Sequence, residues 1–165
     1  MTRPSAADRV VGLGQFVVLQ GSGTAASYGL GSCVAVLMHD ADAKVGGLAH
    51  VVLPSAQLSR ERNNPARFAE TAVPLLVSEM LRAGAVRGRL RARLVGGASM
   101  FAALTPAGSV QMGQRNLNAC RTALQKAGVP VVTEAVGGEI GRSLWFDVAT
   151  GTVTVRSVGR EPEVL

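Results

Sequence analysis

The chain is 165 residues long, with 47% hydrophobic and 17% charged residues and a formal net charge of +6. This length fits one domain with a buried core, and the composition excludes an intrinsically disordered chain. No run of about 18 uncharged apolar residues occurs, and the first residues lack the apolar stretch of an export signal, so we expect neither membrane insertion nor export. Two distant cysteines, Cys33 and Cys120, form no CxxC pair or disulfide framework. We therefore expect a cytoplasmic protein with one domain over residues 1–165, of which 1–9 are flexible.

Short apolar segments rich in β-branched residues predict seven strands. They span residues 15–19, 33–38, 47–53, 89–95, 129–135, 143–148 and 152–158. The second and third flank the sequence DADAK, which predicts a turn and therefore a β-hairpin. If the turn is centred between Ala41 and Asp42, antiparallel pairing places Cys33 opposite His50 on one face of the sheet. A register slip of two residues would leave this pair on one face as diagonal neighbours, whereas a slip of one would separate it. His39, beside the turn, is expected at the surface.

Two further segments have apolar residues at helical spacing. The first follows Asn64 and Pro65, a pair typical of a helix N-terminus, and ends at Gly84. Its predicted core-facing residues are Phe68, Ala72, Leu75, Met80 and Ala83. The second runs from about residue 114 to residue 127 and ends at Gly128. Its predicted core-facing residues are Leu117, Cys120, Leu124 and Ala127, and we interpret the Cys120 thiol as packed and inert. Strands and helices together predict an α+β fold built in layers.

Four arginines alternate with apolar residues at positions 87, 89, 91 and 93, which predicts a strand with one basic face. The plain interpretation is a solvated sheet face. Recognition of nucleic acid is not favoured, because no aromatic residues interleave with these arginines and no nucleic-acid-binding motif accompanies them. A docking surface for an acidic protein is the more plausible function.

Cys33 follows Gly29-Leu30-Gly31-Ser32, where glycines permit a sharp turn that points successive N–H groups outward. A thiolate beside an imidazole can attack a carboxamide carbon while such N–H groups bind the oxyanion. Ammonia leaves, and water activated by His50 hydrolyses the remaining thioester, so the reaction needs no metal or organic cofactor. The residues alone leave a plainer alternative open, in which Cys33 is a small buried hydrophobe and His50 a hydrogen-bonded core residue.

Four blocks of the sequence are informative in combination. They are GLGSCVAVLMHDADAKVGGLAHVVLP at 29–54, VGGASMF at 95–101, MGQRN at 112–116 and GGEIGRSLWFDVATGTVTVR at 137–156. In order and spacing they resemble the chemoreceptor glutamine deamidase (CheD) family of bacterial chemotaxis. The separation of GSC from AHVVLP is the most specific of these features.

The resemblance implies a role for individual residues. Cys33 would be the nucleophile, His50 its base and Ser27 the third catalytic group, although the family commonly has Thr where Ser27 stands. Ser27 keeps a hydroxyl able to orient the imidazole, and Ser22 and Thr24 are competing positions. The implied substrate-binding residues are Gly31, Ser32, Gly96, Gly97 and Ser99.

The resemblance also implies a fold, a substrate and partners. The fold is a layered α/β/β sandwich with a Cys–His site at a β-hairpin, similar to bacterial toxin deamidases. The substrate is a Gln side chain in the cytoplasmic helical region of chemoreceptors, and some family members also bind a chemotaxis phosphatase of the CheC type. Two alternatives stay open, a non-enzymatic adaptor that binds receptors or a phosphatase, and a basic nucleic-acid-binding module. The intact Cys33 and His50 argue against the adaptor.

Overall fold

A computed structural model describes residues 7–165, whose strands form two five-stranded sheets. The first sheet has, in spatial order, β2 (Phe16–Gln20), β5 (Val45–Val51), β4 (Val34–Asp40), β6 (Arg91–Gly96) and β7 (Val131–Val136). The second has β1 (Arg9–Val10), β3 (Thr24–Leu30), β8 (Arg142–Asp147), β9 (Val153–Arg156) and β10 (Glu163–Val164). Each of the seven predicted strands overlaps one of these. The strands β1, β3 and β10 were not predicted.

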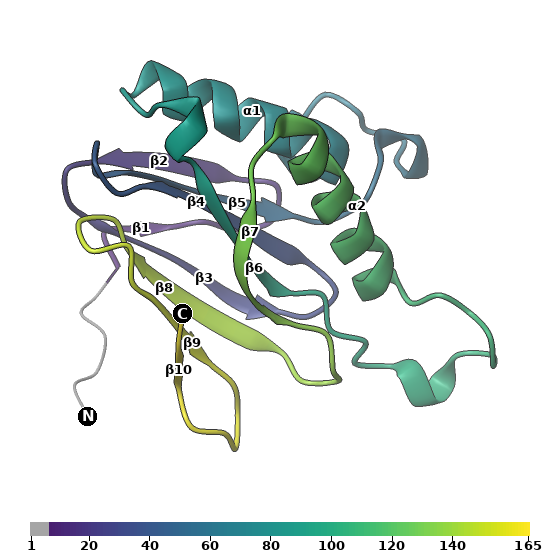
Figure 1. Ribbon diagram of the computed structural model, residues 1–165. Coiled ribbons are helices and arrows are strands. Elements are labelled where there is room, and N and C mark those ends of the chain that lie inside the picture. Colours follow the sequence, from purple (N-terminus) through teal and green to yellow (C-terminus); the bar gives the residue numbers. More distant parts are fainter. Residues whose placement is uncertain (1–6) are drawn as a thin grey trace.

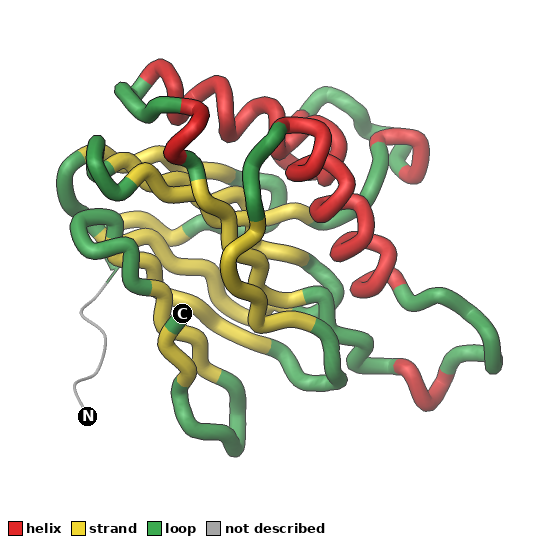
Figure 2. Tube along the Cα trace, in the orientation of Figure 1, coloured by secondary structure: helices red, strands yellow, loops and turns green. Residues whose placement is uncertain are grey.

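The helices lie on one face of the first sheet, and the second sheet covers its other face (Figure 1). They are α1 (Ala69–Arg82) and α2 (Met112–Ala127). Short 3-10 turns, drawn as helix in Figure 2, connect the larger elements; they are η1 (Ala56–Leu58), η2 (Pro65–Arg67), η3 (Arg87–Arg89) and η4 (Ala102–Leu104). One apolar core lies between the helices and the first sheet and a second lies between the sheets. The predicted α+β class is confirmed. Across residues 7–165, no helix combines the length and the apolar character that crossing a membrane requires.

The β4–β5 hairpin exists, but its predicted register is wrong by two residues. Val34 pairs with Val51 and Asp40 with Val45, so the turn is centred one residue later than expected. The reason is the Asp40 side chain, whose Oδ1 accepts hydrogen bonds from the N–H groups of Asp42 and Ala43 at 3.1 and 3.0 Å. These bonds stabilise a four-residue loop in place of a tight turn. Because the shift is an even number, every side chain keeps its predicted face.

The buried stripe of α1 differs from the prediction. It consists of Ala69, Ala72, Val73, Leu76, Val77 and Met80. Leu75 and Ala83 are only half-buried, and Phe68 is buried as the residue that precedes the helix. In α2, the prediction is confirmed for Leu117, Cys120 and Leu124.

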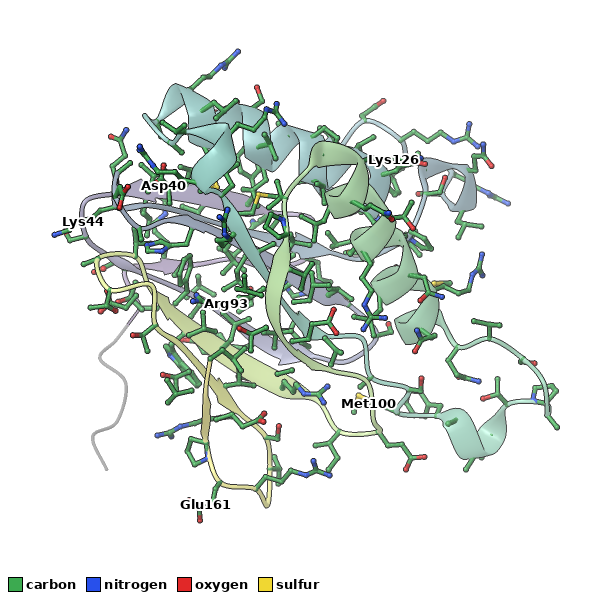
Figure 3. All side chains as sticks on the ribbon, in the orientation of Figure 1. Asp40, Lys44, Arg93, Met100, Lys126 and Glu161 are labelled. Carbon is green, nitrogen blue, oxygen red and sulfur yellow. The ribbon has the colours of Figure 1, made fainter. Side chains whose placement is uncertain are left out.

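The arginine-rich segment is only partly a strand, since η3 precedes β6. Arg89 forms an ion pair with the buried Asp40, and Arg93 donates to the Gly151 carbonyl oxygen in the turn between β8 and β9 (Figure 3). The prediction of a uniformly solvated basic face is therefore wrong. His39 is also not at the surface, because its ring is buried, with Nε2 2.8 Å from the carbonyl oxygen of Val148.

The N-terminal segment was expected to be flexible over residues 1–9. Residues 1–6 lie outside the described part of the chain. Within the rest, Asp8 donates its N–H to the Thr24 carbonyl oxygen at 3.0 Å, and Arg9 pairs with Ala25. Residues 8–10 are thus joined to β3, next to the position of Ser27.

Candidate functional site

Cys33 lies immediately before β4 and is half-buried against the core between the sheets. Its carbonyl oxygen accepts the N–H of Gly97 at 2.8 Å, and the Gly31 carbonyl accepts that of Ala98 at the same distance. Gly96 has a φ of +112°, and a Cβ there would overlap the carbonyl oxygen of Cys33. The residues after β6 therefore hold the backbone of the cysteine loop at close range.

His50 lies on β5 and faces the same side of the sheet as Cys33. In the observed register Ala35 is opposite His50, which makes Cys33 its diagonal neighbour. Leu48, two residues before His50 on β5, belongs to the core between the sheets, against which Cys33 also packs. The structure thus brings both predicted residues to one face, in the diagonal arrangement and not directly opposite each other.

One backbone oxygen fixes the orientation of the imidazole. The His50 Nδ1 lies 3.2 Å from the carbonyl oxygen of Val11, which can only accept, so Nδ1 carries the hydrogen. The other ring nitrogen, Nε2, then has a free lone pair; it is buried and has no hydrogen-bond partner in the described part of the chain. A ring held in this way leaves Nε2 able to accept a proton.

Ser27 reaches the ring indirectly. Its buried Oγ donates to the same Val11 carbonyl oxygen at 2.7 Å. The expected bond from Ser27 to the ring of His50 is not formed among the described residues, and Val11 occupies that position instead. Sequence reasoning missed Val11 because it acts through a backbone atom, which no side-chain pattern reveals.

Burial shifts the pKa of the Cys33 thiol and the pKa of the His50 imidazole in opposite directions, each toward the neutral form. Burial raises the pKa of the Cys33 thiol, although the Arg67 guanidinium and the backbone N–H of Cys33 act in the opposite direction. Burial lowers the pKa of His50, although its bond to the Val11 oxygen opposes this. Burial therefore favours the neutral thiol of Cys33 and the neutral imidazole of His50. Cys120, by contrast, is inside the helix-side core, where burial raises its pKa to about 12.

Asn116, in α2, connects the loop that carries Cys33 with the segment directly after β5. Its Nδ2 donates to the carbonyl oxygens of Ser32 and Val52, both at 2.9 Å. The same helix approaches the loop after β6 so closely that a Cβ at Gly113 would overlap the carbonyl oxygens of Gly97 and Ala98. The block MGQRN drew attention to this segment, but no pattern indicated that its asparagine connects the cysteine loop to the end of β5.

A small cavity opens beside the cysteine loop. Its volume is about 200 Å³, and it is lined by Ser32, Ala98, Ser99, Met100, Phe101, Gln111, Met112 and Gly113. Met100 is in the loop between β6 and α2 (Figure 3), and its sulfur lies over Gly31 in the cysteine loop. Ser32 and Ser99 thus line a cavity, whereas Gly96 and Gly97 are explained by the close approach of Cys33 and Leu117. Contact of these predicted residues with substrate stays a prediction.

Two other features lie apart from this site. A cavity of about 990 Å³ between α1 and α2 is lined by none of the predicted site residues. Over residues 7–165, no group of three or more His, Cys, Asp and Glu side chains is placed to hold a metal ion.

Comparison with known proteins finds similarity over nearly the whole chain. Residues 52–157 match the family described as CheD chemotactic sensory transduction. The probable chemoreceptor glutamine deamidase CheD of Pyrococcus abyssi is 41% identical over 148 residues, 90% of each chain. The chemoreceptor glutamine deamidase CheD of Thermotoga maritima is 40% identical over 151 residues, 92% of each chain. Alignments of this extent include Cys33 and His50, whereas the family match begins two residues after His50.

Proposed function

The chain belongs to the CheD family of chemotactic sensory transduction proteins, and we propose on this basis that it is a chemoreceptor glutamine deamidase. It converts Gln side chains of receptors to Glu and releases ammonia. The observation that carries the proposal is the state of His50, whose Nδ1 is bound to the Val11 oxygen while its buried Nε2 is free on the face that holds Cys33. A base with one fixed and one free nitrogen next to a thiol is the minimum that cysteine amidohydrolysis requires.

The reaction follows from these groups. Nε2 of His50 takes the thiol proton as Sγ of Cys33 bonds to the carboxamide carbon, and the carbonyl oxygen becomes an oxyanion. Backbone N–H groups of the cysteine loop, including that of Cys33, stabilise this oxyanion. The imidazolium returns the proton to the amide nitrogen, the C–N bond breaks, and ammonia leaves a thioester. Nε2 then takes a proton from water, the hydroxide attacks the thioester carbon, and the C–S bond breaks to give the Glu side chain and the free thiol.

The surroundings of the cavity suit a protein substrate. Met100, Phe101 and Leu104 are exposed apolar residues in the loop that borders it. Such residues offer contact area to the face of a helix and exceed what a free amino acid would need. The substrate in this proposal is the cytoplasmic helical region of a chemoreceptor, modified in the cytoplasm, and a CheC-type phosphatase is a second proposed partner. The single-domain arrangement and the similarity to toxin deamidases belong to the same proposal.

Substitution of the two central residues tests the proposed activity. Cys33→Ala and His50→Ala each lower the rate of ammonia release from receptor by about 1,000-fold or more, because neither nucleophile nor base has a substitute. Mass spectrometry of receptor peptides locates the converted glutamines. Cys120→Ala is the matched control, since that thiol is buried in the other core, and it keeps the wild-type rate. Full activity in Cys33→Ala would exclude the mechanism, whereas receptor binding without ammonia release by the wild type would favour an adaptor.

A further inference from the structure

Arg67 ends the turn η2 and borders the strand that carries His50. Its carbonyl oxygen accepts the N–H groups of Val52 and Leu53 at 2.9 and 3.2 Å, directly after β5. Its Cβ lies beside Gly14, whose N–H donates to the His50 carbonyl oxygen at 3.0 Å. Arg67 is therefore bonded to the backbone that follows His50 and lies beside the glycine that bonds His50 itself.

The same residue is close to the nucleophile. Since Val34 pairs with Val51, continuation of the register places Cys33 opposite Val52, the residue that Arg67 binds. Asn116 bonds both Val52 and Ser32, the residue before the nucleophile. These contacts form one cluster in which η2, the end of β5 and the cysteine loop are held together.

The side chain of Arg67 has no anionic partner within ion-pair distance among residues 7–165. Its Nε is buried and has no hydrogen-bond partner in that part of the chain. Arg89 and Arg121, in contrast, each bind a carboxylate at 2.9 Å or less. A half-buried guanidinium without an anion favours negative charge that forms nearby.

Other charged or titratable groups around the thiol do not provide this charge. His50 on β5 is held neutral by burial. Arg142 on β8 donates to the carbonyl oxygens of Gly96 and Gly137, and Arg115 on α2 is exposed. Arg93 on β6 donates to the turn between β8 and β9. Arg67 is the cation whose charge lowers the pKa of Cys33 against the larger effect of burial.

We propose that Arg67 is a positioning residue of the site, whose fixed positive charge stabilises the Cys33 thiolate formed when His50 takes the thiol proton. The role rests on the proposed function, in which this thiolate attacks the carboxamide. The proton moves from Sγ to Nε2, and the guanidinium keeps its own proton throughout. Arg67 therefore acts through Cys33 and takes part in no bond-making step.

The rate of alkylation of Cys33 by iodoacetamide tests this role without any receptor. The full chain is titrated from about pH 6 to pH 10, a range that brackets an ordinary thiol, and the Cys33 peptide is quantified by mass spectrometry. Arg67→Gln alkylates about threefold to tenfold more slowly at neutral pH, with its profile displaced to higher pH, because the thiolate fraction falls. Arg67→Lys keeps the charge and stays within about twofold of the wild type. Arg62→Gln, which removes an exposed charge from the same segment, has no effect.

Two results would overturn the proposal. In one, Arg67→Gln has the wild-type alkylation profile while circular dichroism shows an intact fold. In the other, the profile of Arg67→Lys is displaced as far as that of Arg67→Gln, which would assign the effect to lost packing. If Arg67→Gln does not fold, Arg67→Lys is compared with the wild type, and a profile displaced to higher pH although the charge is kept would likewise overturn the proposal. A displaced alkylation profile in a protein that releases no ammonia from receptor would support the role of Arg67 and contradict the proposed function, so the two failures are distinguishable.

Discussion

The carbonyl oxygen of Val11 is the atom on which the orientation of the His50 imidazole depends. It accepts from both His50 and Ser27, while the Val11 N–H donates to the carbonyl oxygen of Ala26 at 2.8 Å. Backbone groups of Val11, directly after β1, and of Ala26 in β3 are thus part of the surroundings of His50. The hydroxyl of Ser27 holds the oxygen in place, and the oxygen in turn selects the tautomer of the ring.

Substitution of Ser27 separates this indirect role from a direct one. Ser27→Ala removes the 2.7 Å bond to Val11 but leaves the Val11–His50 bond, so kcat falls about threefold to tenfold and is not abolished. Ser27→Thr keeps the donor, and its activity stays within about threefold of the wild type although the added methyl group enters a fully buried position. Steady-state kinetics at saturating receptor give both values. Wild-type kcat in Ser27→Ala would show that the Val11 oxygen needs no support.

The loop after β6 holds the backbone of Cys33, the proposed nucleophile, by close contact. Gly96→Ala forces a Cβ into the Cys33 carbonyl oxygen and a side chain onto a φ of +112°. We expect kcat/KM to fall by about 100-fold or more, because displacement of the nucleophile by a fraction of an ångström is costly. The free energy of unfolding should fall by about 2 to 4 kcal/mol.

Gly84 provides the matched control for backbone strain. It has a φ of +103° and no atom within 4 Å of an added Cβ. Gly84→Ala therefore lowers the free energy of unfolding by about 1 kcal/mol and leaves kcat/KM unchanged. Equal activity in the Gly84→Ala and Gly96→Ala variants would show that the contact between Gly96 and Cys33 does not matter for catalysis.

The sequence predicts the hairpin and its buried face because apolar strands flank a polar turn. It does not predict the register, since the two-residue shift depends on bonds from Asp42 and Ala43 to the Asp40 carboxylate. The strand β3 has the sequence TAASYGL, in which Thr24 is the single β-branched residue, and it forms because it pairs with β1 and β8. Cys33 and His50 could be found from side-chain chemistry and family resemblance. The role of Val11 could not, because a backbone oxygen has no signal in sequence.

The two ends of β4 have separate tasks in the whole molecule. Cys33 precedes one end, and Asp40 stands at the other, about 20 Å away for a strand of this length. The buried Asp40 carboxylate accepts from Arg89 at 2.9 Å and from the Val86 N–H at 2.8 Å, and so joins the hairpin turn to the segment after α1 (Figure 3). We therefore expect stability at this end to be separable from the proposed chemistry at the other.

Asp40→Ala tests this separation, since it removes the acceptor of the Val86 and Ala43 N–H groups and the nearer of the two carboxylates that pair with Arg89. The midpoint of thermal unfolding should fall by about 5 to 10 °C, because buried hydrogen-bonding groups lose their acceptor. The deamidation rate of the folded protein, measured at about 25 °C, should stay at the wild-type value. Asp42→Ala removes a carboxylate that is 77% exposed and 3.7 Å from Arg89, and it should change the midpoint by about 1 °C at most. Equal midpoints in the two variants would contradict a stabilising role for Asp40.

The effect of Asp40 on stability depends on pH in a defined direction. Burial alone would raise the pKa of Asp40, but the hydrogen bonds from Arg89, Val86 and Ala43 lower it well below the ordinary value of 3.8. Because the folded pKa is depressed, the contribution is complete above the ordinary value and is lost as the pH falls from there through the folded pKa. The difference in unfolding midpoint between wild type and Asp40→Ala should thus be constant from about pH 7 to pH 5 and shrink below the ordinary Asp pKa. A difference that instead shrinks as the pH rises above neutrality would show that another group sets the stability of this end of the sheet.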